Sequence, residues 1–170
     1  MTIEVAMQRD LRDLPLAAPL DLRPFRAGDE SLWVDLQMST GVYRSISHET
    51  FSRDLGTDRS LHEERIVFVE RQGVAVATGA AWLAKPPLSS EWGRLHWIAV
   101  RPEFHRRGIG RALCLALLDR MRSWGHSHCS LTTGSSNQRA IRLYRSIGFS
   151  AFPRTAEERE YWEHEEKVSD

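Results

Sequence analysis

The segment Leu95–Arg111 constrains the fold most, because its periodicity changes from that of a strand to that of a helix across two glycines. Residues 95–100 form a mostly apolar run that is typical of a strand, and Pro102 ends it. Gly108 and Gly110 follow in a short loop. After this loop, apolar side chains recur every four residues, which predicts an amphipathic helix. A strand that leads through a glycine loop into a helix is typical of a sheet covered by helices.

The other periodicities predict a mixed chain of strands and helices. Alternating or continuous apolar runs predict strands, and capping residues followed by helical periods predict helices. The predicted strands cover residues 20–25, 65–70, 74–83 and 127–133, and the predicted helices cover residues 29–38, 49–55, 109–124 and 137–147. A last strand is expected around Tyr161–Lys167, where the alternation is poor. This order predicts an α/β or α+β fold with a central mixed sheet flanked by helices.

The chain has 170 residues, which is the size of one domain. We expect an N-terminal arm of residues 1–19, which contains Pro15 and Pro19, and a single domain of residues 20–170. The C-terminal segment Glu157–Asp170 is strongly acidic. It is interpreted either as a solvated tail or as one wall of a cleft for a cationic amine.

Composition excludes several classes of function. The 23 basic and 23 acidic side chains cancel, whereas a protein that binds nucleic acid usually carries a basic excess, so we expect no nucleic-acid partner. The longest uncharged apolar run, residues 74–84, is shorter than the roughly 20 residues of a membrane span. Cys114 and Cys129 form no disulfide framework, and His126 and His128 lack a third ligand nearby, so we expect no metal. These features predict a soluble cytoplasmic protein with no membrane partner.

The glycine loop has the chemistry of an anion site. The first amides of a helix lack partners within the helix and carry a partial positive charge, and glycines allow a ligand to approach the backbone. A phosphate or pyrophosphate is therefore the expected ligand. Four arginines add positive charge around the loop: Arg101, Arg106, Arg107 and Arg111. The loop fits neither the P-loop nor the dinucleotide fingerprint, and taken alone it also fits a tight turn with solvated arginines.

A second motif, one strand later, gives the loop a context. It reads Asn-x-x-Ala-x-x-Leu-Tyr-x-x-x-Gly-Phe over Asn137–Phe149. It follows Val100-Arg101-Pro102 and then His105-Arg106-Arg107-Gly108-Ile109-Gly110 in the correct order. Together these motifs resemble the general N-acetyltransferase superfamily (GNAT). The resemblance is specific over residues 94–152 and weaker from Leu22 through residue 83.

This resemblance implies a fold and a donor. The twisted sheet would splay open beside Leu95–Val100, and acetyl-CoA would bind in the opening. The backbone of three strand residues would pair with its pantetheine arm, the amides of the loop would hold its pyrophosphate, and Asn137 would contact its arm. The cofactor-binding residues implied are Ile98, Ala99, Val100, Arg106, Arg107, Gly108, Ile109, Gly110, Arg111 and Asn137.

The implied reaction is transfer of an acetyl group from acetyl-CoA to a primary amine by direct attack. Tyr144 would lie near the sulfur and act as the general acid that protonates the leaving thiolate. The alternative role of Tyr144 is core packing on its helix. Neither Cys114 nor Cys129 lies where the thioester is expected, so no covalent enzyme intermediate is predicted.

His96 is the candidate general base. It alternates with Ile98 and Val100, so we expect it to face the cofactor, and the ordinary pKa of histidine suits a base. The alternative is a hydrogen-bonded histidine on a half-buried strand. Glu70 and Glu91 are further carboxylate candidates, each also explained as a solvated edge residue.

Two departures from the family pattern bear on function. His105 stands where the family usually has Arg or Gln, which would make a side-chain contact to phosphate sensitive to pH. The strand before Asn137 carries no carboxylate over Cys129–Thr133, which counts against the subclass that acetylates protein N-terminal alanine.

The acceptor side is less defined. Residues 39–63 line the acceptor cleft in the family, and by this analogy Trp33, Tyr43 and Arg44 are candidates. Trp82 or Trp92, if exposed, would serve either this cleft or a homodimer interface. The alternative function is a catalytically silent CoA-binding sensor or interaction domain, which would bind acetyl-CoA without acceptor-dependent release of thiol.

Overall fold

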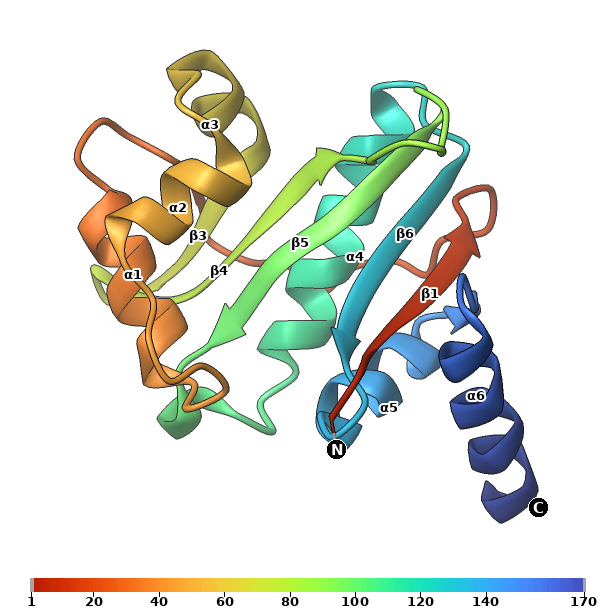
Figure 1. Cartoon of the computed structure of the whole chain (residues 1–170). Coiled ribbons are helices and arrows are strands. Elements are labelled where there is room, and N and C mark those ends of the chain that lie inside the picture. Colours follow the sequence, from red (N-terminus) through yellow and green to blue (C-terminus); the bar gives the residue numbers. More distant parts are fainter. Residues whose placement is uncertain (1, 170) are drawn as a thin grey trace.

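The computed structural model describes residues 2–169, and within them seven strands form one sheet in the order β2-β3-β4-β5-β6-β1-β7 (Figure 1). The strands are β1 (Glu4–Asp10), β2 (Leu22–Pro24), β3 (Ile66–Arg71), β4 (Val74–Leu83), β5 (Trp92–Val100), β6 (His128–Gly134) and β7 (Ser150–Ala151). All neighbours are antiparallel except β5 and β6, which are parallel. The prediction of a central mixed sheet is confirmed.

Helices cover both faces of this sheet. They are α1 (Glu30–Ser39), α2 (His48–Leu55), α3 (Arg59–Arg65), α4 (Ile109–Ser123), α5 (Gln138–Ser146) and α6 (Ala156–Ser169), with a short 3-10 turn at Pro102–Phe104. Helix α4 lies against one face, and α1 and α2 lie on the other side near β3 and β4 (Figure 1). Leu113 and Leu117 of α4 are fully buried in one core, and Trp33 and Phe51 anchor the other core under α1 and α2.

Strands β5 and β6 separate after a short paired region. Their pairing is limited to residues 92–94 of β5 and 128–130 of β6, and beyond this the two strands diverge (Figure 1). Residues 95–100 therefore present an unpaired edge toward β6, where backbone groups lack a sheet neighbour. The sheet is splayed at the position predicted from the sequence.

Two predicted boundaries are wrong. Residues 4–10, assigned to an N-terminal arm, form β1, which inserts between β6 and β7. Residues 161–167, expected as a strand, belong to helix α6. The two corrections are linked, because the buried Glu158 carboxylate of α6 accepts the Ala6 N–H of β1 at 3.2 Å. β7 pairs only with Met7 and Gln8, so α6 supplies the acceptor that the ladder lacks at this residue.

The acidic C-terminal segment is consequently part of a helix over residues 157–169, while Asp170 lies outside the described residues. No helix within residues 2–169 is both long and apolar enough to cross a membrane.

Candidate active site

The glycine loop leaves a row of backbone amides free at the start of α4. Arg106 (φ 61°) and Gly108 (φ 76°) adopt left-handed conformations, which turn the chain sharply into the helix. Among the described residues, the amides of residues 106–111 have no hydrogen-bond acceptor, and the first helical bond of this turn is Ala112 N to Gly108 O at 3.0 Å. Six unpartnered N–H groups at the positive end of a helix form an anion cradle.

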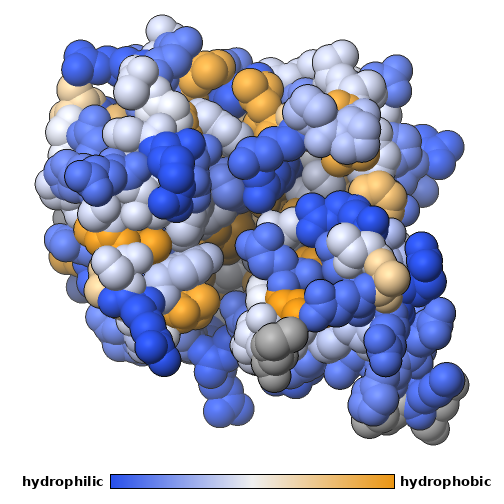
Figure 2. Space-filling model, viewed as in Figure 1, coloured by the Kyte–Doolittle hydropathy of each residue, from blue (hydrophilic) through white to orange (hydrophobic). Residues whose placement is uncertain are grey.

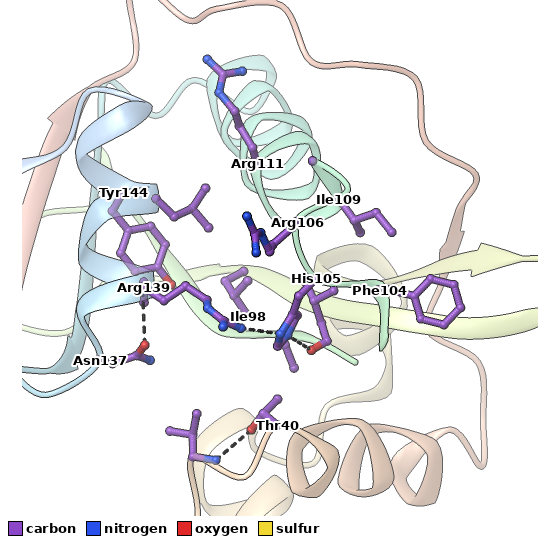
Figure 3. A pocket seen from close by; sticks show the side chains of 17 residues that line it. Thr40, Ile98, Phe104, His105, Arg106, Ile109, Arg111, Asn137, Arg139 and Tyr144 are labelled. Atoms are coloured by element: carbon purple, nitrogen blue, oxygen red, sulfur yellow. Dashed lines mark hydrogen bonds between the residues drawn. The ribbon is translucent and has the colours of Figure 1, made fainter. Parts of the chain in front are cut away.

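A cavity of about 440 Å³, here called the loop cavity, lies beside this cradle (Figure 3). It is bounded by the end of β5, the glycine loop, the start of α4 and helix α5. Its lining residues are Thr40, Val42, Ile98, Ala99, Val100, Phe104, His105, Arg106, Gly108, Ile109, Gly110, Arg111, Asn137, Arg139, Ala140, Leu143 and Tyr144. Nine of the ten residues predicted to bind the cofactor are in this list; the guanidinium of the tenth, Arg107, lies over the Phe104 ring at 5.3 Å.

The arginines of the loop do not all face the cavity. Arg106 and Arg111 line it, together with Arg139 of α5, which the sequence analysis missed. Arg101 turns away, and its Nε donates to the Ala75 carbonyl of β4 at 3.0 Å. Arg139 lies two positions after the motif residue Asn137, on an exposed face of α5. It is not itself a motif residue, and an arginine on an exposed helix face is common, so the sequence did not indicate its place in the cavity.

His105 connects the two sides of the loop cavity (Figure 3). Its Nε2 lies 2.8 Å from the Val100 carbonyl, and its Nδ1 contacts the Arg139 guanidinium. Because a guanidinium only donates, Nδ1 must be the acceptor, and Nε2 donates to Val100. The His105 side chain thus links β5 to α5, and both of its ring nitrogens are engaged by groups of the protein.

A second, more polar cavity of about 690 Å³ lies on the face that carries α1 and α2 and is here called the front cleft. Figure 2 shows this face hollowed between two lobes of the molecule. The two cavities share six lining residues: Thr40, Val42, Ile98, Asn137, Ala140 and Tyr144. Tyr43 lines the front cleft as expected, whereas Trp33 is fully buried and Arg44 is not a lining residue.

Tyr144 stands where the two cavities meet. The side chain is 8% exposed and projects from α5 into the loop cavity (Figure 3). Its hydroxyl has no hydrogen-bond partner among the described residues. Burial raises the pKa of the phenol well above its ordinary value near 10, so the hydroxyl keeps its proton at neutral pH. The arrangement provides a proton donor at the junction of two cavities.

Asn137 is placed by its role as the N-cap of α5. Its Oδ1 accepts the Ala140 N–H at 3.3 Å. The sequence predicted this cap. Asn137 lines both cavities, so the cap also fixes a polar side chain at their junction.

A bulge in β5 places the side chains of His96 and Ile98 on opposite faces of the sheet. Strand β4 shifts register between Thr78 and Ala80, and Trp97 has a φ of 52°. The Ile98 side chain packs over Gly79 toward α4, where a Cβ on the glycine would come within 2.5 Å of it. Leu95 also faces α4, so His96 lies on the opposite face, in the front cleft. The expectation that His96 shares a face with Ile98 is therefore wrong.

His96 is also a weak base in this environment. Burial, followed by the nearby positive charge of Arg94, lowers its pKa to about 3. An imidazole with this pKa is neutral near pH 7 and holds an extra proton poorly. Its Nε2 is buried and has no partner among the described residues, so it is a free hydrogen-bonding atom on the cleft wall. Glu70, another candidate base, lines neither cavity. Its carboxylate forms an ion pair with Arg23, with 2.6 Å between Oε1 and Nε.

The front cleft also contains charged residues that the sequence analysis missed. Glu4 lines it from β1, Asp54 from α2 and Arg94 from β5. Asp54 is paired with the adjacent Arg53 at 2.8 Å. These residues come from three distant segments of the chain, so no local motif indicates that they meet.

The two cysteines and the tryptophans Trp82 and Trp92 line neither cavity. Cys114 and Cys129 are fully buried, and burial raises the pKa of the Cys114 thiol to about 12, which leaves it unreactive. Trp82 is not exposed: it is 8% accessible and packs in the core under α1 and α2. Trp92 stacks on the His128 ring, with the centroids 4.7 Å apart. No group of three His, Cys, Asp or Glu residues suited to a metal ion occurs in residues 2–169.

Comparisons with known proteins agree with this geometry. The model of the acetyltransferase (GNAT) family matches residues 29–149. A mycothiol acetyltransferase of Acidimicrobium ferrooxidans is 30% identical over 161 residues, which cover 85% of this chain and 50% of that protein. The chain therefore spans about half the length of the curated relatives of this name.

Two further similarities concern the motif region and the fold. The ribosomal protein bS18-alanine N-acetyltransferase of Escherichia coli is 43% identical over 53 residues, covering 31% of this chain and 36% of that protein. The crystal structure of a diaminobutyrate acetyltransferase from Paenibacillus lautus, in complex with its substrate and coenzyme A, has a TM-score of 0.60 and 21% identity. It covers 75% of this chain and 74% of that chain, and at this identity it shows the fold alone.

Proposed function

The chain belongs to the acetyltransferase (GNAT) family, and from this membership we propose that it transfers an acetyl group from acetyl-CoA to a primary amine by direct attack. One observation carries the proposal: the loop cavity and the front cleft meet at Tyr144. A donor in the first cavity and an acceptor in the second would meet beside a side chain that holds a proton.

The residues of the loop cavity fit acetyl-CoA. The free amides of residues 106–111 and the guanidinium groups of Arg106, Arg111 and Arg139 suit a pyrophosphate. The unpaired edge of Ile98–Val100 offers backbone groups to an amide-bearing arm. When bound, acetyl-CoA supplies the activated acetyl thioester.

The side chains at the junction then have defined tasks. Backbone N–H groups on the free edge of β5 stabilise negative charge on a carbonyl oxygen under attack. Tyr144 gives its proton to the departing thiolate. Asn137 holds the start of α5, and with it the position of Tyr144. The buried thiols take no part, so the amine attacks the thioester carbon without a covalent enzyme intermediate.

The proton of the incoming amine goes to the front cleft and not to His96, whose pKa of about 3 is too low for this task. Glu4 and Asp54 are the carboxylates that line the cleft. They attract the ammonium form of the acceptor, and its proton passes through water in the open cleft to bulk solvent.

An assay of acceptor-dependent thiol release tests the function. Acetyl-CoA is mixed with the protein and a panel of primary amines, and the free thiol is measured with and without each amine. Release that requires an amine, together with the acetylated amine as product, supports the enzyme. Tight binding of acetyl-CoA with no amine-dependent release would instead identify the sensor domain.

A further inference from the structure

Arg94 is an unsatisfied cation in the wall of the front cleft. It precedes His96 by two residues on β5, so both side chains lie on the same face of the strand. Among the described residues, its side chain makes one hydrogen bond, from Nη2 to the Thr132 hydroxyl at 3.3 Å, and it has no ion pair. A guanidinium has five donors in a planar fork, so most of its capacity is unused.

The setting of Arg94 differs from that of a solvated surface arginine. The side chain is half-buried, and its desolvation lowers the pKa of the guanidinium. Glu4 and Asp54 act on it only through electrostatic attraction, without contact, and Asp54 is already paired with Arg53. A partly desolvated cation that lacks a contacting anion favours the binding of one.

Neighbouring groups support an anion at this place. Lys85, just after β4, lines the same cleft. The hydroxyl of Thr132, which accepts from Arg94, lies on the cleft wall and has its own proton to donate. The carboxylates of Glu4 and Asp54 in the same cleft suit the opposite charge, an ammonium group. The cleft thus has partners for both ends of a zwitterion.

The distance along the strand sets the size of the ligand. Arg94 and Ile98 are four residues apart, which corresponds to on the order of 10 Å along a bulged strand. The reacting amine has to reach the junction at Ile98 and Tyr144. The anionic group then lies several bonds from the amine, at the other end of the acceptor.

We propose that the acceptor is an amine that also carries an anionic group, a carboxylate or a phosphate, and that Arg94 binds this group. The inference rests on the proposed acetyl transfer and specifies its substrate class. Arg94 is a residue for acceptor specificity and takes no part in binding acetyl-CoA, since it lines only the front cleft and the adjoining surface groove beside Pro86.

Matched pairs of amines test the inference on the wild-type protein. Amino carboxylates of increasing length, from glycine to 6-aminohexanoate, are compared with their carboxamides, and phosphoethanolamine is compared with ethanolamine. We expect kcat/KM to be about 10-fold or more higher for the anionic member of a pair, since an ionic hydrogen bond is of this strength. The two series tell a carboxylate site from a phosphate site. Equal kcat/KM within every pair would overturn the inference and leave the proposed function intact.

Variants test whether Arg94 causes the preference for anionic over neutral amines. Arg94→Gln should remove it by raising KM for the anionic members, with similar values for the neutral ones, and Arg94→Lys should retain part of it. Arg122→Gln is the control, because this cation lies on α4 outside both cavities and is paired with Asp119, and the preference should persist in this variant. A preference that survives Arg94→Gln would contradict the assignment.

Failure of the proposed function is recognised separately. If no amine is acetylated, the same probes are added to CoA-loaded protein and the melting temperature is measured. Stabilisation by 6-aminohexanoate or phosphoethanolamine that Arg94→Gln abolishes supports the anion site even then. The absence of any stabilisation by the anionic probes overturns it.

Discussion

The side-chain amide of Gln37 donates a 2.8 Å hydrogen bond to the backbone carbonyl of Trp97. Gln37 is buried on α1, and Trp97 is the bulge residue of β5 with a φ of 52°. The bond ties a helix on the front face to the point where β5 leaves its ladder. Since the bulge decides which side chains of β5 face each cavity, Gln37 positions the site without lining the loop cavity.

Replacing Gln37 with Leu should lower the free energy of unfolding by about 1–3 kcal/mol, because the Trp97 carbonyl loses its partner while the volume is kept. Urea unfolding measures this change. Gln37→Glu should cost more, since a carboxylate would face the carbonyl oxygen. If Gln37→Leu is as stable as wild type, the bond does not hold the bulge.

Tyr144→Phe should lower kcat by about 100-fold or more, because the thiolate would leave without a proton donor. The affinity for acetyl-CoA should stay within about twofold and the stability should hardly change, since the hydroxyl has no hydrogen-bond partner within residues 2–169. Steady-state kinetics and calorimetric titration measure both. Tyr161→Phe is the control, because its hydroxyl contacts Ser135 and Gln138 outside the cavities, and it should keep full turnover. Full activity of Tyr144→Phe would exclude it as the acid.

Gly108→Ala tests the anion cradle against a matched glycine. Gly108 and Gly125 both have left-handed φ values, 76° and 88°, and a Cβ would meet no atom within 4 Å at either position. Each alanine variant should lose about 1 kcal/mol of stability from backbone strain. Only Gly108→Ala should weaken acetyl-CoA binding, because its methyl group and altered turn disturb the free amides. Equal affinities in the two variants would place the pyrophosphate elsewhere.

Acid should destabilise the fold through His96. Its pKa is about 3 in the folded protein and near 6.5 when unfolded, so the unfolded chain binds the proton more tightly between these values. Stability is therefore complete above about pH 6.5 and falls as the pH drops toward 3. Between pH 7 and about pH 4.5, wild type should lose about 2 kcal/mol more than His96→Gln in urea unfolding. The exposed His164→Gln should behave as wild type, and an identical loss in His96→Gln would contradict the burial argument.

The parts of the site that local sequence encodes were predictable. The glycine loop, the period of α4 and the cap at Asn137 depend on neighbours within a few residues, and each occurs where the sequence places it. The family motifs add the roles of these residues, because the motifs specify chemistry at fixed spacing.

The rest depends on contacts between distant segments. β1 is held by β6, β7 and Glu158, more than a hundred residues away, and its own residues are too mixed in polarity to indicate a central strand. The side of His96 depends on a bulge fixed by Gln37 and by the missing Cβ of Gly79. Alternation within β5 alone predicts that His96 shares a face with Ile98. Arg94 was missed because the other walls of its cleft come from distant segments of the chain.

We infer that the two cavities form one reaction site joined at Tyr144. Its most direct test is mass-spectrometric detection of an acetylated amine after incubation of the protein with acetyl-CoA and the amine panel, in parallel for wild type and Tyr144→Phe. We expect an acetylated product to form with wild type, and its rate of formation to fall about 100-fold or more with the variant. Product formation at the same rate in both proteins, or acetyl-CoA binding without product from any amine, would contradict it.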